Sequence, residues 1–140
     1  MSARKTAMAR NPIRKTSNPA LFLDVLLEDD QFFFVIRNTT DAPIYQASIE
    51  LDKKIIGRDG QTDLAKLKIF RKIETLAPHK SIRIFIDRRG PYFARRQPTV
   101  VTAKIAYRDA EGTRFTSVLK HDFSIYKDLD CDGIGARTRR

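Results

Sequence analysis

The sequence predicts an all-β fold, an immunoglobulin-like sandwich of seven or eight antiparallel strands. Three observations indicate it. Apolar and polar residues alternate within short stretches, turn-forming residues separate these stretches at intervals of about ten residues, and a helical period is almost absent. The chain has 140 residues, of which 41% are hydrophobic, so it can bury one core and is not expected to be disordered as a whole.

The amino-terminal half is expected to form three strands. Residues 21–28 alternate between apolar and polar positions, and Asp29-Asp30 supplies a turn. Residues 32–36 (FFFVI) are apolar at every position, which predicts a central strand covered on both sides. The polar sequence NTTDAP favours a turn, because Asn and Asp bond their own backbone and Pro presets φ. Alternation resumes at 45–51, as in a strand with one wet face.

The carboxy-terminal half is expected to add the remaining strands. Residues 52–65 are mostly loop, and 66–75 fit either a strand or a short helix, of which we favour the strand. Three clear strands follow at 81–87, 101–107 and 115–123, and a hairpin turn at Asp109-Ala110-Glu111-Gly112 joins the last two. Ile84 and Ile105 lie mid-strand on apolar faces and should be core residues.

We expect three parts along the chain. Residues 1–19 are a disordered basic arm, residues 20–127 form the sandwich, and residues 128–140 are a flexible tail. The amino-terminus lacks the apolar stretch of a secretory signal, and the longest apolar runs are too short to span a membrane. A single cysteine, Cys131, cannot form an internal disulfide. Together these features predict a cytoplasmic protein.

Charge is the feature that most directly suggests a ligand. The net charge is +10, and residues 66–96 carry ten bases against two acids. Within them, two arginine pairs flank Tyr92 and Phe93 in a Gly-Pro loop. Arginine suits phosphate or carboxylate, and exposed aromatic rings stack on bases or anchor peptides. This basic band predicts a site for a polyanion or partner, made of Arg88, Arg89, Tyr92, Phe93, Arg95 and Arg96, extended by Lys66, Lys68, Arg71 and Lys72. The alternative, which we favour, is that the two aromatic side chains close the open end of the sandwich.

No residue pattern predicts catalysis, a metal or a cofactor. His121 and Asp122 are neighbours on one expected strand and point to opposite faces, so they do not pair; His121 is expected to be a half-buried structural residue. The two histidines and Cys131 are too few and too scattered for a structural zinc site. Asp128, Asp130, Asp132 and Gly133 match the start of a calcium loop, but its twelfth position is Arg139 instead of glutamate. We therefore expect no calcium site.

Three sequence patterns resemble a known group of domains. They are FFFVIRNTTDAPIYQASIEL, LAPHKSIRIFID and AYRDAEGTRF, followed by Asp122, Ser124 and Tyr126. Their order resembles the immunoglobulin-like or fibronectin-III-like β-sandwich domains of uncharacterised prokaryotic proteins, over about residues 21–126. His79 stands where those domains usually have glycine, and the membrane-spanning segment that often precedes them is not seen here. The resemblance implies the fold and a binding or scaffolding role, with no catalytic residues.

These observations predict a non-enzymatic binding or scaffolding module that recognises a protein partner through a sheet face or end loops. The alternative is binding of a nucleic acid or another polyanion through the basic band 66–96 and the amino-terminal arm. Neither a small-molecule substrate nor a membrane span is expected. Salt dependence distinguishes the two, because phosphate binding weakens steeply with added salt and an apolar protein contact does not.

Overall fold

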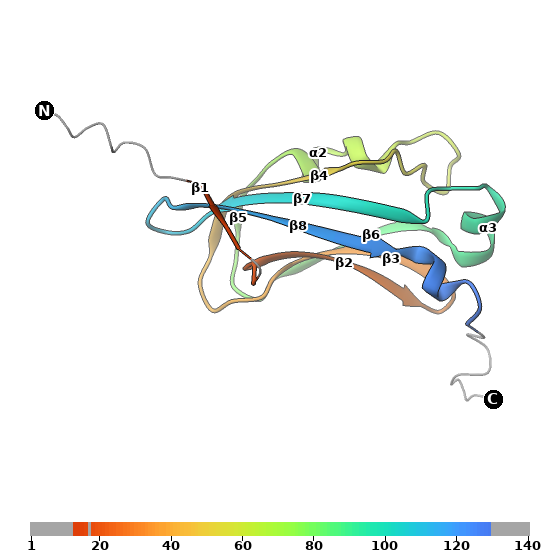
Figure 1. Ribbon diagram of the computed structural model, residues 1–140, viewed down its shortest axis with the longest axis horizontal. Helices are drawn as coiled ribbons and strands as arrows, with labels where there is room; N and C mark the ends of the chain where they lie inside the picture. Colours follow the sequence, from red (N-terminus) through yellow and green to blue (C-terminus); the bar gives the residue numbers. More distant parts are fainter. Residues whose placement is uncertain (1–12, 17, 130–140) are drawn as a thin grey trace, which may run out of the picture.

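The computed structural model describes residues 13–16 and 18–129, which form eight strands in two packed sheets with short helices only (Figure 1). The strands are β1 Ile13–Lys15, β2 Leu21–Glu28, β3 Gln31–Asn38, β4 Ile44–Leu51, β5 Ile73–Leu76, β6 Ser81–Arg88, β7 Val100–Arg108 and β8 Arg114–Asp122. The helices are η1 Leu64–Lys66, α2 Lys68–Arg71, α3 Arg89–Ala94 and η2 Phe123–Tyr126. None of these helices is long and apolar enough to cross a membrane.

The two sheets differ in size and in strand direction. One has five strands in the order β1-β8-β7-β4-β5, and the other has three antiparallel strands in the order β2-β3-β6. The larger sheet is mixed, because β1 runs parallel to β8. The expectation of a purely antiparallel sandwich is therefore wrong. No hairpin joins β1 to β8, so nothing in the connection imposes the antiparallel direction.

The first strand also corrects the expected arm. Residues 13–15, placed in the arm by the sequence, form β1 against Arg114, Phe115 and Thr116 of β8. Three residues are too few to show an alternating pattern, so the sequence contains no signal for this strand. The rest of the arm, apart from Thr16, Asn18 and Pro19, lies outside the described residues.

The core fills the space between the sheets. Phe32, Phe34 and Ile36 of β3 point into it, and Ile105 of β7 is only 1% exposed, as predicted. Ile84 of β6 packs against the core but keeps part of its surface accessible. One end is filled by aromatic rings that meet edge to face around Phe32, with centroid distances of 5.2–5.8 Å to Tyr92, Phe93, Phe123 and Tyr126.

Two segments are helical where the sequence favoured a strand or a loop. Residues 64–71 form η1 and α2, and the strand β5 occupies only Ile73–Leu76. The Asp63 side chain caps η1 by accepting from the Ala65 amide, and Phe70 enters the core with its ring 5.8 Å from that of Phe34. Two apolar side chains of this segment, Leu64 and Phe70, are thus buried in the core. Residues 89–94 form α3 instead of an exposed Gly-Pro loop, and Pro91 is tolerated because the first turn of a helix needs no amide donor.

Candidate binding surfaces

Tyr92 and Phe93 close one end of the sandwich, as the favoured interpretation predicts. Tyr92 is 0% exposed, its hydroxyl donates to the Pro98 carbonyl at 2.6 Å, and its ring stacks on that of Phe123 at 5.0 Å. Burial raises the pKa of the Tyr92 phenol far above its ordinary value. A ring held in this way is not free to stack on a nucleic-acid base, which removes Tyr92 from the predicted site.

The four arginines around α3 do not form one exposed cluster. Arg89 Nε lies 2.8 Å from Asp30 Oδ1, and its guanidinium also donates to the carbonyls of Tyr126 and Leu129. Arg95 lies 3.2 Å from the buried Asp87 carboxylate and donates to the carbonyls of Gly57 and Arg58 at 3.1 and 3.2 Å. One arginine of each pair therefore ties loops to the sandwich end. Arg88 and Arg96 are exposed, and no side chain in the described part of the protein pairs with them.

The cations of η1 and α2 form a separate surface. Lys66, Lys68, Arg71 and Lys72 are all exposed around the buried Phe70. Of these four cations, only Lys72 has an ion pair within the described part of the chain, with Glu74 at 3.2 Å. Figure 1 shows α2 beside β4, whereas α3 lies at one end of the sandwich. The basic band predicted from the sequence is thus divided into a side surface and an end surface.

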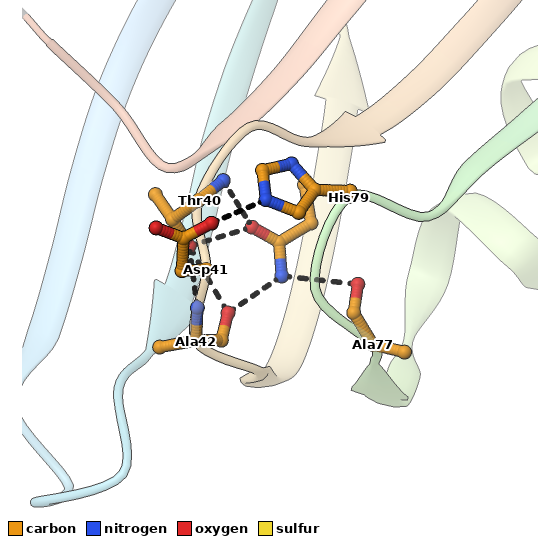
Figure 2. A network of polar contacts seen from close by, with 6 residues as sticks. Thr40, Asp41, Ala42, Ala77 and His79 are labelled. Carbon is orange, nitrogen blue, oxygen red and sulfur yellow. Dashed lines mark hydrogen bonds and ion pairs between the residues drawn. The ribbon is translucent and has the colours of Figure 1, made fainter.

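The opposite end is held by a polar network at the turns after β3 and β5 (Figure 2). The buried Asn38 amide donates to the carbonyls of Ala42, Leu76 and Ala77 at 2.8–3.2 Å, and its oxygen accepts from the Thr40 amide and hydroxyl. His79, with φ of 59°, lies 2.5 Å from Asp41 on the surface. These bonds join two loops that are far apart in the sequence into one junction at this end.

His121 has the structural role that the sequence predicts. It is half-buried, and its Nε2 lies 2.7 Å from the Leu23 carbonyl of β2. It therefore joins the edges of the two sheets. No group of three or more His, Cys, Asp or Glu side chains in the described ranges is placed to hold a metal. Asp130, Cys131, Asp132, Gly133 and Arg139 lie outside those ranges, so the expected absence of a calcium site stays a prediction.

A surface that the sequence analysis did not identify lies on the solvent side of the three-stranded sheet. Since Phe32, Phe34 and Ile36 point into the core, Phe33 and Val35 must point to the opposite side. Leu26 on β2 and Phe85 on β6 are in register with Phe33 and share its side of the sheet. Phe22 is on the same side, opposite Arg37, which is two residues from Val35. We call Phe22, Leu26, Phe33, Val35 and Phe85 the outer apolar face; none of them belongs to the core between the sheets.

Within residues 13–16 and 18–129, another layer covers only one side of β3, which corrects the expectation of two. The described helices lie elsewhere, α2 on β4 and α3 at the end (Figure 1). Val35 is nevertheless only 2% exposed. Arg83 reaches across Phe33 to Glu28, with the guanidinium 5.3 Å from the ring centroid and 2.6 Å from the carboxylate. A single ion pair thus covers part of the central ring.

Comparison with known protein families finds one match for this chain. A family model described as "Domain of unknown function (DUF8453)" matches residues 1–127. The chain belongs to this family. The DUF8453 match ends one residue after η2 and includes both β1 and the whole sandwich. A search of curated proteins finds none that matches the chain.

Proposed function

We propose that this DUF8453 domain is a non-enzymatic binding module that recognises a protein partner through its outer apolar face. One observation carries the proposal: five apolar side chains, three of them phenylalanine, line the outer side of a sheet whose other side already supplies the core. Four of them are partly accessible to solvent, and Val35 is buried among them. Contiguous exposed apolar patches are rare on monomeric proteins and mark interaction sites. Aromatic residues are enriched in protein interfaces, whereas Lys and Glu are depleted there.

The dimensions of the face indicate the kind of contact. Strands of eight residues are about 26 Å long, and three of them side by side are about 15 Å wide. A face of this size suits a weak or transient contact, for which the total buried area stays below about 1,200 Å². Its charges nearly balance, two acids (Asp24, Glu28) against three bases (Arg37, Arg83 and Arg88, which is in register with Gln31), so shape and apolar burial select the partner more than net charge does.

We infer further that the sandwich is immunoglobulin-like. The strand order supports this assignment: β2, β3 and β6 occupy the places of strands A, B and E, and β4, β7 and β8 those of C, F and G. β5 then lies beside β4 on the second sheet. Folds of this type serve many functions, so the outer apolar face, and not the fold, is the basis of the functional proposal.

The proposal is tested by removing the face without unfolding the sheet. Phe33→Thr combined with Phe85→Thr deletes the central ring pair and keeps residues that favour strands. Ile125→Thr is the matched control, since Ile125 is an apolar residue 65% exposed on η2. In affinity capture from extract of the cells of origin, we expect a discrete protein to bind the wild type and the control but not the double variant. Identical captured proteins for all three would refute the proposal.

The second candidate, polyanion binding, is supported by the four exposed cations of η1 and α2, three of which have no ion pair among the described residues. Replacing Lys66, Lys68, Arg71 and Lys72 by Ala should then abolish retention on heparin at about 0.15 M salt, because phosphate and sulfate contacts are lost together with counterion release. The variant in which only Arg88 and Arg96 are replaced by Ala is the comparison, because it removes two exposed cations from the end surface and leaves those around α2 in place. Equal retention of the wild type and the fourfold variant would exclude this surface.

A further inference from the structure

The edge of β8 is covered over only part of its length. β1 pairs with Arg114, Phe115 and Thr116, and the last bond of this pairing runs from the Thr16 amide to the Thr116 carbonyl at 3.0 Å. The chain then crosses to the other sheet, where β2 begins at Leu21. From Ser117 to Asp122, no strand in the described part of the chain is hydrogen-bonded to the backbone of β8 on that side. β2 of the other sheet comes near its far end, where the His121 ring meets the Leu23 carbonyl.

The direction of the backbone groups along this edge follows from the pairing. Thr116 points its carbonyl toward β1, and alternate residues of a strand point their backbone groups to the same side. Val118 and Lys120 therefore present their amides and carbonyls outward, while Ser117 and Leu119 bond to β7. Within the described ranges, no group bonds to the backbone of Val118 or Lys120. These are the groups that an added strand would pair with.

A second, independent observation is a hollow at the point where β1 ends. It has a volume of about 520 Å³ and is lined by Lys15, Thr16, Thr116, Ser117 and Val118. The Val118 side chain is 62% exposed on the outer side of the sheet. The hollow thus continues the line of β1 along the uncovered part of β8 and offers an apolar contact there.

We propose that the free edge of β8 binds an extended peptide segment of a partner protein, which pairs with Val118 and Lys120 as a strand added to the five-stranded sheet. Main-chain bonds of this kind give affinity, and alternate side chains give specificity. The segment places an apolar residue beside Val118 and an acidic residue beside Lys120, since Lys15 lines the hollow and the exposed Lys120 is the next outward-facing residue along the edge. The surface is separate from the outer apolar face, which belongs to the other sheet.

The charge of Lys120 argues against a second copy of the chain as the occupant. Two β8 edges that pair antiparallel around Lys120 would place two lysines directly opposite each other, which is destabilising. A segment with an acidic residue at that position does not meet this obstacle.

The experiment uses the isotope-labelled full chain and the pentapeptide Thr-Val-Thr-Glu-Thr, with Ala, Ile or Phe replacing Val in further members of the set. We expect saturable amide shifts at Val118 and Lys120 in NMR titrations at concentrations up to about 1 mM. N-methylation of the alternate peptide residues that face β8 should abolish the shifts, and N-methylation of the other residues should not.

Lys120→Glu should reverse the preference between Thr-Val-Thr-Glu-Thr and Thr-Val-Thr-Lys-Thr, by up to about fivefold for one exposed ion pair. Lys68→Glu, on α2, changes the net charge by the same amount and should leave the preference between the two peptides unchanged.

Three results would overturn the proposal. The first is an absence of shifts at Val118 and Lys120 with every peptide of the set. The second is binding that neither pattern of N-methylation affects, since that would show a side-chain contact only. The third is a set of shifts confined to β2, β3 and β6, which would support the outer apolar face and remove the edge of β8 as a peptide site.

Discussion

Replacement of Asn38 should reveal how much the junction between the two end loops contributes to stability. In Asn38→Ala, two amide hydrogens and two accepted hydrogen bonds are lost from a side chain that is fully buried. Each bond contributes about 1 kcal/mol net. Thr40 and Ala42 lie at the surface, where water can replace their hydrogen bonds to Asn38. The Leu76 carbonyl is buried, so its lost bond is not replaced. We therefore expect the free energy of unfolding to fall by about 3 kcal/mol.

Asn38→Asp is the sharper variant, because it keeps the size of the side chain and changes only its polarity. A carboxylate oxygen would replace the amide nitrogen that faces the carbonyls of Ala42, Leu76 and Ala77. Burial and these carbonyls disfavour the charged form, so the pKa of the introduced carboxyl would be higher in the folded than in the unfolded state. The variant's stability relative to wild type should then be highest below about pH 4 and fall as the pH rises.

Urea unfolding at pH 7 and pH 3.5 measures both effects. Thr39→Ala is the control, since the neighbouring Thr39 hydroxyl is exposed and makes only bonds of 3.2–3.4 Å to the carbonyls of Pro19 and Ala20. If Asn38→Ala came within about 1 kcal/mol of this control, the bonds of Asn38 would not stabilise the junction. If Asn38→Asp were the milder variant at pH 7, the argument from the three carbonyls would be wrong.

Three further predictions concern single side chains. Burial raises the pKa of Tyr92, so its contribution to stability holds below about pH 10 and is lost above it; Tyr92→Phe should flatten the alkaline fall in urea midpoint. The Thr62 hydroxyl, which donates to Asp59, lowers the pKa of that carboxyl to about 2, and Thr62→Val should return it toward 3.8 in an NMR titration. Because the folded pKa is depressed, the stability linked to Asp59 is present above pH 3.8 and lost as the pH falls toward 2. Ile105→Ala should cost about 2–5 kcal/mol by urea unfolding, and a cost equal to that of Lys53→Ala would contradict its place in the core.

The features predicted correctly from the sequence are the local ones. Asp29-Asp30 and the 109–112 hairpin are turns because Asp29, Asp30 and Gly112 have φ of 53°, 62° and 84°, which Asp and Gly tolerate better than most residues. The strands β6, β7 and β8 follow the alternation of their own side chains. Each of these turns and strands depends on residues that are close together in the sequence, so the sequence alone is enough to predict it.

The features that the sequence did not predict depend on distant partners. In α2, Phe70 contacts Phe34, and Arg89 and Arg95 form ion pairs with Asp30 and Asp87, which lie beside them only in the folded chain. A count of bases along 66–96 cannot distinguish a cation that is free from one that ties two loops together. For the same reason, Asn38 is recognisable as a turn residue but not as the centre of a network that includes the turn after β5.

The interpretation of FFFVI shows how a correct observation led to a wrong conclusion. A run that is apolar on both faces fits a strand covered on both sides, and β3 is indeed the central strand of its sheet. In an antiparallel sandwich, however, one side of each sheet faces solvent, so alternation is the ordinary pattern. The absence of alternation at Phe33 and Val35, together with Phe22, Leu26 and Phe85 in the neighbouring strands, therefore required an explanation on the solvent side. If the proposed function holds, an unbroken apolar strand within a sandwich is the feature of the sequence that indicates the outer apolar face.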